Sequence, residues 1–185
     1  AFKRVTAATN ERTLVGCFLP WSTISYTLYL VTCSAEFQSM LPCLGANLFS
    51  NVGDFVVRQK TSQPSLPMGV VLETAFLPPS VYGQHCPWEE TYNALKDWLL
   101  PRILELTYTA WDLEPFANDC GWTGPPFRWD EDRRFLLRCE LDAAFFHLYL
   151  SSEPNGGWQQ AENETAEDLA RLKASFPTPR HAADY

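Results

Sequence analysis

Residues 47–60 read Asn47-Leu-Phe-Ser-Asn51-Val-Gly-Asp54-Phe-Val-Val-Arg58-Gln-Lys60, and they set the architecture predicted for the first half of the chain. Apolar residues follow helical spacing from Ala35 to Lys60. The polar run at residues 47–51 interrupts this spacing, as do Pro42 and Gly45. We therefore expect two short helices here rather than one long helix. The apolar face predicted for the second helix contains Val52, Phe55 and Val56.

Segments rich in β-branched and aromatic residues flank these helices. Residues 13–20 and 24–33 are typical of strands, with a Pro-Trp-Ser break between them. A third strand is predicted from Val70 to Leu77, after a polar loop, and Pro78-Pro79 would end it. Residues 1–85 are thus expected to form a small β-sheet with two short helices.

After Gly83 the spacing of apolar residues becomes typical of helices. A seven-residue apolar stripe predicts one long amphipathic helix, kinked at Pro101. Asp112 is placed to cap a short helix ending before Gly121. The stripe comprises Trp88, Tyr92, Leu95, Leu99, Ile103, Leu106 and Ala110.

Two more helices are expected towards the end of the chain. One begins near Asp130, and after a loop at residues 151–157 a polar surface helix spans about 164–175. The first of them should bury Leu136, Cys139, Ala143, Phe146 and Leu150. The predicted class is α+β, with residues 1–85 packed on a mainly helical part, residues 86–185.

Composition indicates a folded chain with no membrane-spanning segment. Its 185 residues are 46% hydrophobic and 19% charged, enough for one core. No apolar run approaches the roughly 18 residues of a membrane span, and the first residues lack a signal-peptide core. The six cysteines lack the two-residue spacing of metal or redox motifs, so we expect buried free thiols. A cytoplasmic location follows as an expectation.

Charge is distributed unevenly along the chain. The formal net charge is −8, but residues 1–66 hold five basic and three acidic side chains, which is +2. The remainder therefore carries −10. Because neutralised phosphates supply most of the affinity for nucleic acid, any contact with a polyanion is expected in the first third.

Motifs for catalysis are missing from the sequence. The nine glycines form no Gly-x-Gly pair for a nucleotide cofactor, and no lysine has an acid two residues ahead of it. Gly124-Pro-Pro-Phe127 lacks the polar side chain that an amino-methylating enzyme uses to bind its target base. His85-Cys86 is a weak zinc signal. We predict no catalytic residues, no metal and no cofactor within this chain.

Two basic clusters remain open to more than one interpretation. In one interpretation, Arg58-Gln59-Lys60 complements a helix dipole and Arg58 pairs with Asp54. In the other, these side chains reach base edges in a DNA groove. The residues alone do not decide between the two interpretations. Arg133, Arg134 and Arg138 lie among acids, and ion pairs such as Arg138–Asp142 and Glu131–Arg134 on a solvated face are favoured over phosphate binding.

Two groups of motifs resemble a known family. The first is Ala7-Ala-Thr-Asn-Glu-Arg-Thr13, then Asn47 to Asn51 leading into Asp54-Phe-Val-Val-Arg-Gln-Lys60, then Leu77-Pro-Pro79. The second is Pro101 to Ala117, Pro126-Phe-Arg-Trp-Asp130, and Glu140 through Tyr149. In this order they resemble the C-terminal target-recognition region of large bacterial type II restriction-modification DNA methylases, over residues 5–150.

This resemblance implies a non-catalytic, DNA-recognising part of an adenine-specific methylase. Double-stranded DNA is the expected partner, together with an upstream methylase domain that uses S-adenosylmethionine. The abrupt start at Ala1 and a short last helix from Thr178 fit a piece of such a protein. The residues expected to contact DNA are Lys3, Arg4, Arg12, Thr13, Arg58, Gln59 and Lys60.

An alternative is a structural or subunit-interaction module of a bacterial defence complex without DNA contact. The −10 charge and abundant aromatic residues after residue 66 favour it.

Overall fold

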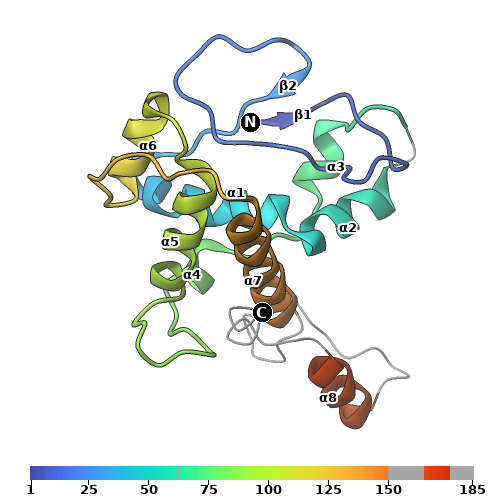
Figure 1. The fold of residues 1–185 in the computed structure, drawn as a ribbon. Coiled ribbons are helices and arrows are strands. Elements are labelled where there is room, and N and C mark those ends of the chain that lie inside the picture. The colour runs from blue at the N-terminus through green and yellow to red at the C-terminus, as the bar shows by residue number, and fades with distance from the viewer. Residues whose placement is uncertain (62, 150–164, 176–185) are drawn as a thin grey trace.

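The computed structural model describes residues 1–61, 63–149 and 165–175, and its elements are shown in Figure 1. About 52% of the chain is helix and 3% is strand, which confirms the α+β class. The elements in chain order are β1 (Phe2–Lys3), β2 (Leu28–Tyr29), η1 (Ala35–Met40), α1 (Leu41–Phe49), α2 (Asn51–Lys60), α3 (Met68–Leu72), α4 (Pro79–Tyr82), α5 (Leu95–Thr107), η2 (Trp111–Leu113), α6 (Glu114–Asp119), α7 (Glu131–Tyr149) and α8 (Ala166–Ser175).

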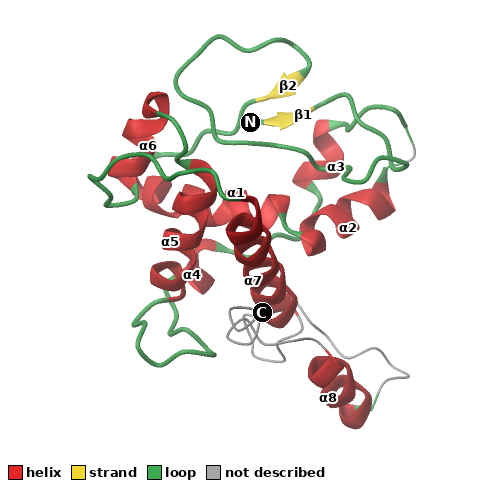
Figure 2. Cartoon of the chain, viewed as in Figure 1, coloured by secondary structure: helices red, strands yellow, loops and turns green. Residues whose placement is uncertain are grey.

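The sheet is a short antiparallel pair at one edge of the molecule, as Figure 2 shows. Phe2 pairs with Tyr29 and Lys3 with Leu28, and Phe2 also bridges Gly16. The strands predicted over 13–20 and 24–33 are therefore wrong in extent. Backbone groups that a strand would pair are used elsewhere in this region, because the N–H groups of Thr13 and Leu14 bind a side chain of α2.

The third predicted strand, Val70 to Leu77, is also wrong. Met68–Leu72 is helix α3, which starts after Pro67, and Thr74 closes it by donating its hydroxyl to the Val70 carbonyl oxygen at 2.7 Å. Residues with high strand propensity form a strand only where a neighbouring strand can pair with them. In the described residues the sheet has just two strands, at residues 2–3 and 28–29, so the Val-Val pair folds locally instead.

The two helices predicted between residues 35 and 60 are confirmed, preceded by the 3-10 turn η1. Ser50 ends α1 and caps α2, because its hydroxyl oxygen accepts the Gly53 N–H at 3.1 Å. Gly53 is required at this bend, since a Cβ there would lie 2.4 Å from the Asn47 carbonyl oxygen.

The face predicted for the second helix is only partly correct. Val52 is buried, but Phe55 is 61% exposed and Val57 is fully buried. The reason is that α2 turns Asp54 inwards, where it binds the N-terminal segment. The buried side of the helix therefore lies away from Phe55.

Helix α5 carries the C-terminal part of the predicted stripe. Leu95, Leu99 and Ile103 are buried as expected, and the helix continues through Pro101. It begins only after Ala94, however, so Trp88 and Tyr92 precede the helix and Ala110 follows it. The Leu95 N–H donates to the Gln84 carbonyl oxygen at 2.7 Å, which fixes the start of the helix against the preceding turn.

Helix α7 begins where predicted, since the Asp130 carboxylate accepts the Arg133 N–H at 3.0 Å. Its buried face differs: of the predicted residues only Ala143 is buried, while Leu136, Cys139 and Phe146 are partly exposed and Leu150 lies outside the described residues. The buried arc is set by contacts with both α5 and α2 and by the ion pair of Glu140 with Arg102. It comprises Leu137, Glu140, Leu141, Ala143, Ala144, Phe145 and Leu148.

Two shorter predictions hold. The helix expected near Asp112 is present as η2 and α6, and Gly121 follows with a φ of 80°, a conformation that favours glycine. The predicted cap is wrong, because Asp112 lies within η2 and the N-cap residues are Ala110 and Leu113. The polar helix is α8, and its exposed residues include Arg171. The predicted loop at 151–157 and the helix at Thr178 lie outside the described residues.

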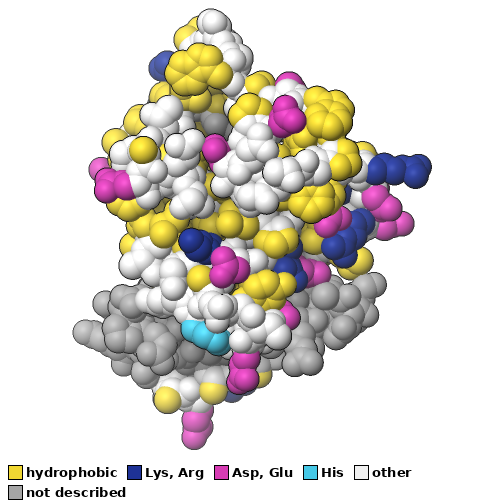
Figure 3. Space-filling view, turned by 90° about the vertical axis from the view of Figure 1, so that its left-hand side faces the viewer, with side chains coloured by type: hydrophobic (Ala, Val, Ile, Leu, Met, Phe, Trp, Pro, Cys, Tyr) yellow, Lys and Arg dark blue, Asp and Glu magenta, His cyan; other side chains and the backbone are white. Residues whose placement is uncertain are grey.

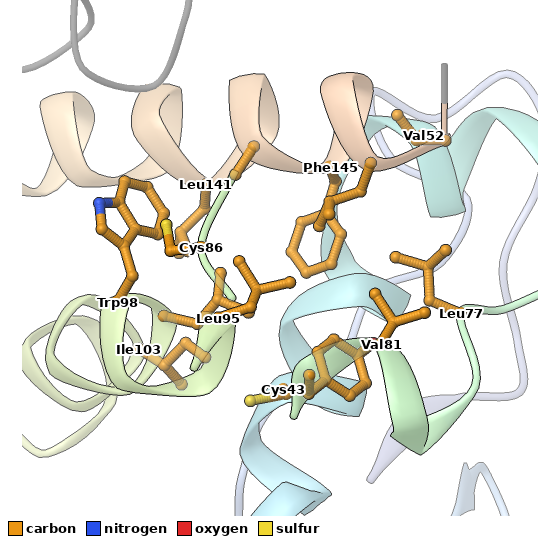
Figure 4. Packing of buried hydrophobic residues seen from close by; sticks show 14 residues of the cluster. Cys43, Val52, Leu77, Val81, Cys86, Leu95, Trp98, Ile103, Leu141 and Phe145 are labelled. Carbon is orange, nitrogen blue, oxygen red and sulfur yellow. The ribbon is translucent and has the colours of Figure 1, made fainter. Parts of the chain in front are cut away.

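The largest hydrophobic cluster joins helices from both predicted parts of the chain. Figure 4 shows Leu95 and Trp98 of α5 close to Leu141 of α7, with Phe145 beside Leu77 and Val81. Cys43 and Val52 contribute from α1 and α2. The cluster therefore includes residues on both sides of residue 85.

Asn47 ties this core together with polar contacts. Its side chain is fully buried, and its amide oxygen accepts the Leu77 N–H at 3.1 Å and the Tyr82 hydroxyl at 3.4 Å. Its amide nitrogen donates to the Tyr149 hydroxyl at 3.1 Å, and Tyr149 in turn donates to the Ala75 carbonyl oxygen. One side chain thus connects α1, the segment before α4, α4 and α7.

No single helix in the part of the chain that the structure describes is long and apolar enough to cross a membrane. Only the pair Ala35–Phe49 and Asn51–Lys60, bent by 62°, meets the length and composition when taken together.

All six cysteines are free, and their burial differs from the expectation. Cys43 and Cys86 are buried, but Cys17 and Cys33 are exposed. Burial is the main cause that raises the pKa of the Cys43 thiol to about 12.

We predict that Asn47→Ala lowers the free energy of unfolding by about 2–4 kcal/mol, because the Leu77 N–H and the Tyr82 hydroxyl lose their buried acceptor. Urea unfolding measures this. Asn10→Ala is the control, since Asn10 is exposed and its side chain donates one long hydrogen bond, to Thr6 at 3.4 Å. Equal stability of the two variants would contradict the role assigned to Asn47.

We also predict that iodoacetamide at pH 8 modifies Cys17 and Cys33 in the folded protein, while Cys43 and Cys86 react only after unfolding. Thiolate is the reactive form, and burial raises the pKa of both protected thiols. Peptide mass mapping before and after denaturant checks this. Rapid labelling of Cys43 in the native protein would show that the α1 core is open.

Candidate nucleic-acid interface

The N-terminal segment is attached to α2 by one buried carboxylate. Asp54 is 4% exposed, and a single carboxylate oxygen accepts the N–H groups of Thr13 at 2.6 Å and Leu14 at 2.7 Å. The other oxygen pairs with Arg58 at 2.9 Å, one turn further along the helix. Because buried charge is costly without such partners, this arrangement fixes where residues 7–14 lie.

Arg58 points into this arrangement rather than towards a partner. Its guanidinium donates to the carbonyl oxygens of Ala8 at 3.0 Å and Glu11 at 2.7 Å, in addition to Asp54. The helical pairing with Asp54, left open by the sequence, is therefore formed. Arg58 thus positions the segment before Thr13, and because its side chain is 30% exposed its contact with DNA stays a prediction.

Thr13 is removed from the predicted contacts. Its side chain is completely buried, with the hydroxyl 3.4 Å from the Ala7 carbonyl oxygen, so no partner molecule reaches it. Arg12 is half-buried and lies 3.7 Å from Asp142 of α7. It faces the helical half instead of the remaining predicted contacts.

The other four predicted residues are exposed, Lys3 and Arg4 at the end of β1 and Gln59 and Lys60 at the end of α2. The Arg4 carbonyl oxygen accepts the Leu66 N–H at 2.7 Å, which places the end of β1 beside the loop that follows α2. Lys60, at the end of α2, donates its ammonium to the Glu73 carbonyl oxygen at 2.6 Å. We name Lys3, Arg4, Gln59 and Lys60 the basic edge.

The basic edge offers three cations and one amide on a fixed frame. The Arg4 guanidinium lies 5.9 Å from the centre of the Tyr29 ring on β2, so the strand pair supports it. Cations on such a frame suit phosphate oxygens, and glutamine pairs with adenine edges in the major groove. Within the described residues, no three His, Cys, Asp or Glu side chains come together in a group that could hold a metal ion.

Three arginines line a cavity that the sequence did not predict. A cavity of about 360 Å³ lies between the N-terminal segment, α1, α5 and α7, and Arg12, Arg134 and Arg138 line it. The favoured pairs Arg138–Asp142 and Glu131–Arg134 are not the ones formed: Arg138 is 3.7 Å from Glu131, and Arg133 pairs with Glu105 at 2.9 Å. Helical spacing shows that Arg134 and Arg138 share a face, but not what that face meets.

A scan against protein-family models matches no family, and searches of curated proteins and of solved structures likewise find no match.

We predict that Asp54→Ala lowers the free energy of unfolding by about 3–5 kcal/mol, because two buried N–H groups and the Arg58 guanidinium lose their shared acceptor. Urea unfolding gives the value, and hydrogen exchange at the Thr13 and Leu14 amides should accelerate. Asp112→Ala, at an exposed position, is the matched control and should change stability by less than about 0.5 kcal/mol. Unchanged exchange at both amides would show that Asp54 does not hold this segment.

Proposed function

We propose that this chain recognises double-stranded DNA for a bacterial, adenine-specific methylase of a restriction-modification system and carries no catalytic centre itself. The observation that supports this most directly is the basic edge, where Lys3, Arg4, Gln59 and Lys60 are exposed at the ends of β1 and α2 on a chain of net charge −8.

Charge asymmetry favours one way of approaching a duplex. Residues 1–66 carry +2 and the remainder carries −10, so the acidic part is repelled by phosphates while the basic edge is attracted. An uneven charge distribution of this kind orients a protein on DNA even where its total charge is unfavourable. The ion pair of Asp54 and Arg58 holds residues 7–14 in place beside α2.

Chemistry is assigned to a different part of the proposed methylase. The resemblance over residues 5–150 supports an upstream domain that binds S-adenosylmethionine and transfers the methyl group. Under this proposal the chain acts in the bacterial cytoplasm, as part of defence against phage DNA, and needs no cofactor.

A second candidate function is docking onto another protein subunit. Large aromatic side chains are exposed along residues 111–135, and Figure 3 shows hydrophobic side chains interspersed with charged ones on the face that lies on the left in Figure 1. Aromatic residues with a polar surround are typical of protein interfaces. The exposed aromatics of this region are Trp111, Trp122, Trp129 and Phe135.

DNA binding is tested with the triple variant Lys3→Ala, Arg4→Ala and Lys60→Ala. Fluorescence anisotropy with a labelled random duplex should show affinity that falls with salt for the unchanged chain. In the variant we expect a loss of roughly tenfold or more and a salt slope smaller by about 2–3. Loss of three phosphate contacts is the physical reason.

Arg128→Ala is the matched control, because Arg128 is exposed in the acidic part of the chain. It should leave both the affinity and the salt slope unchanged. If the triple variant binds DNA like the unchanged chain, or if neither binds, the proposed function fails. Trp129→Ala then tests the second candidate function. That function predicts weaker binding of a partner subunit by the variant and an unchanged affinity for DNA.

A further inference from the structure

The cavity between the two halves of the chain has an apolar wall. Phe18 of the N-terminal segment and Phe49 of α1 present their rings to it, with ring centres 6.4 Å apart and planes at 76°. Ile103 of α5 and Leu141 of α7 line it as well. A volume of about 360 Å³ lies in the range of sites for small organic ligands.

Positive charge gathers at one side of this cavity. Arg134 and Arg138 are one turn apart on α7, and Arg12 approaches from the N-terminal segment. Asp142 is the one carboxylate among the lining residues, so the charges there sum to +2. Burial is the main cause that lowers the pKa of Arg134. Arg138 adds to this effect, while Glu131 and Glu105 oppose it.

Asp142 offsets only one of the three positive charges, and both of its oxygens also accept hydrogen bonds from Asn51. They accept the backbone N–H and the side-chain amide of Asn51, each at 2.6 Å. Arg12 stays 3.7 Å away, beyond hydrogen-bonding distance. Its Nη1 atom is buried without a hydrogen-bond partner among the described residues.

Arg138 and Arg134 differ in how firmly they are held. Arg138 meets Glu131 only at 3.7 Å, and both side chains are more than half exposed, so this pair contributes little. Arg134 donates to the Leu106 carbonyl oxygen at 2.9 Å and lies 3.6 Å from the centre of the Trp129 ring. The cavity therefore combines one fixed guanidinium with two that lack a close anionic partner.

We propose that this cavity binds a phosphate monoester carried on a flat aromatic ring system, of the size of a mononucleotide. A phosphate monoester carries a charge of about −1.5 to −2 at neutral pH, which matches the +2 of the lining residues. Guanidinium groups bind phosphate oxygens through paired hydrogen bonds. The ring system contacts Phe18 and Phe49, where aromatic stacking or edge contact stabilises it. The proposal is independent of DNA recognition at the basic edge.

Adenosine monophosphate is the probe, with adenosine and inorganic phosphate as its two halves. Isothermal titration with the full chain should show saturable binding of the nucleotide, with each half binding at least roughly tenfold more weakly. The chemical shifts of Phe18 and Phe49 should move with the nucleotide. Absence of saturation at millimolar nucleotide, or equal binding of inorganic phosphate alone, overturns the proposal.

Arg138→Gln tests the charge requirement at an exposed position. We expect roughly tenfold weaker binding of adenosine monophosphate, with an unchanged thermal midpoint that shows intact folding. Arg128→Gln, at an exposed position outside the cavity, should bind as the unchanged chain does. Equal affinity of the Arg138 and Arg128 variants overturns the assignment.

The source of the monoester is resolved by competition. A 5′-phosphorylated single strand that displaces the nucleotide, while its unphosphorylated twin does not, supports recognition of a nucleic-acid end. Failure of both strands to compete supports a free nucleotide. Displacement by the unphosphorylated strand alone would contradict the role of the monoester.

Discussion

Two N–H groups that share one oxygen of the Asp54 carboxylate hold the N-terminal segment against the helices. The donors, Thr13 and Leu14, belong to a segment that has almost no strand pairing of its own. A carboxylate buried to this degree is stable only with close donors, and Arg58 supplies the remaining one. The position of the first fourteen residues, and with it the placement of the sheet, therefore depends on this buried charge.

The same interaction separates two uses of positive charge. Because Arg58 is bound to Asp54 and to two carbonyl oxygens and is half-buried, the exposed cations among the described residues of the segment 1–66 are those at the end of β1 and the end of α2. Arg12, only one residue before Thr13, is turned the other way and meets α7. A segment with five basic residues thus presents the basic edge on one side and an arginine-lined cavity on another.

The helical half supports these surfaces with a mixed polar and apolar core. Asn47 joins α1, α4 and α7, and the Arg102–Glu140 pair joins α5 to α7, where Arg102 also lies 3.6 Å from the Trp98 ring. Buried polar groups of this kind permit only those helix orientations in which every donor meets its acceptor. That constraint also sets the face that α7 turns towards the cavity, and hence the directions of Arg134 and Arg138.

The sequence by itself determined the break at residues 47–51 that separates α1 from α2, the start of α7 near Asp130 and the α+β class, because caps and helix-interrupting residues act locally. Tertiary structure decided the rest. The strand over Val70 to Leu77 lacked a neighbour to pair with, and the faces of α2 and α7 rotated to bring Asp54 and Glu140 to partners distant in sequence. Thr13 and Arg12 illustrate the same limit for the candidate site: no spacing rule states which of two adjacent side chains is buried and which lines a cavity, since contacts over forty or more residues choose between them.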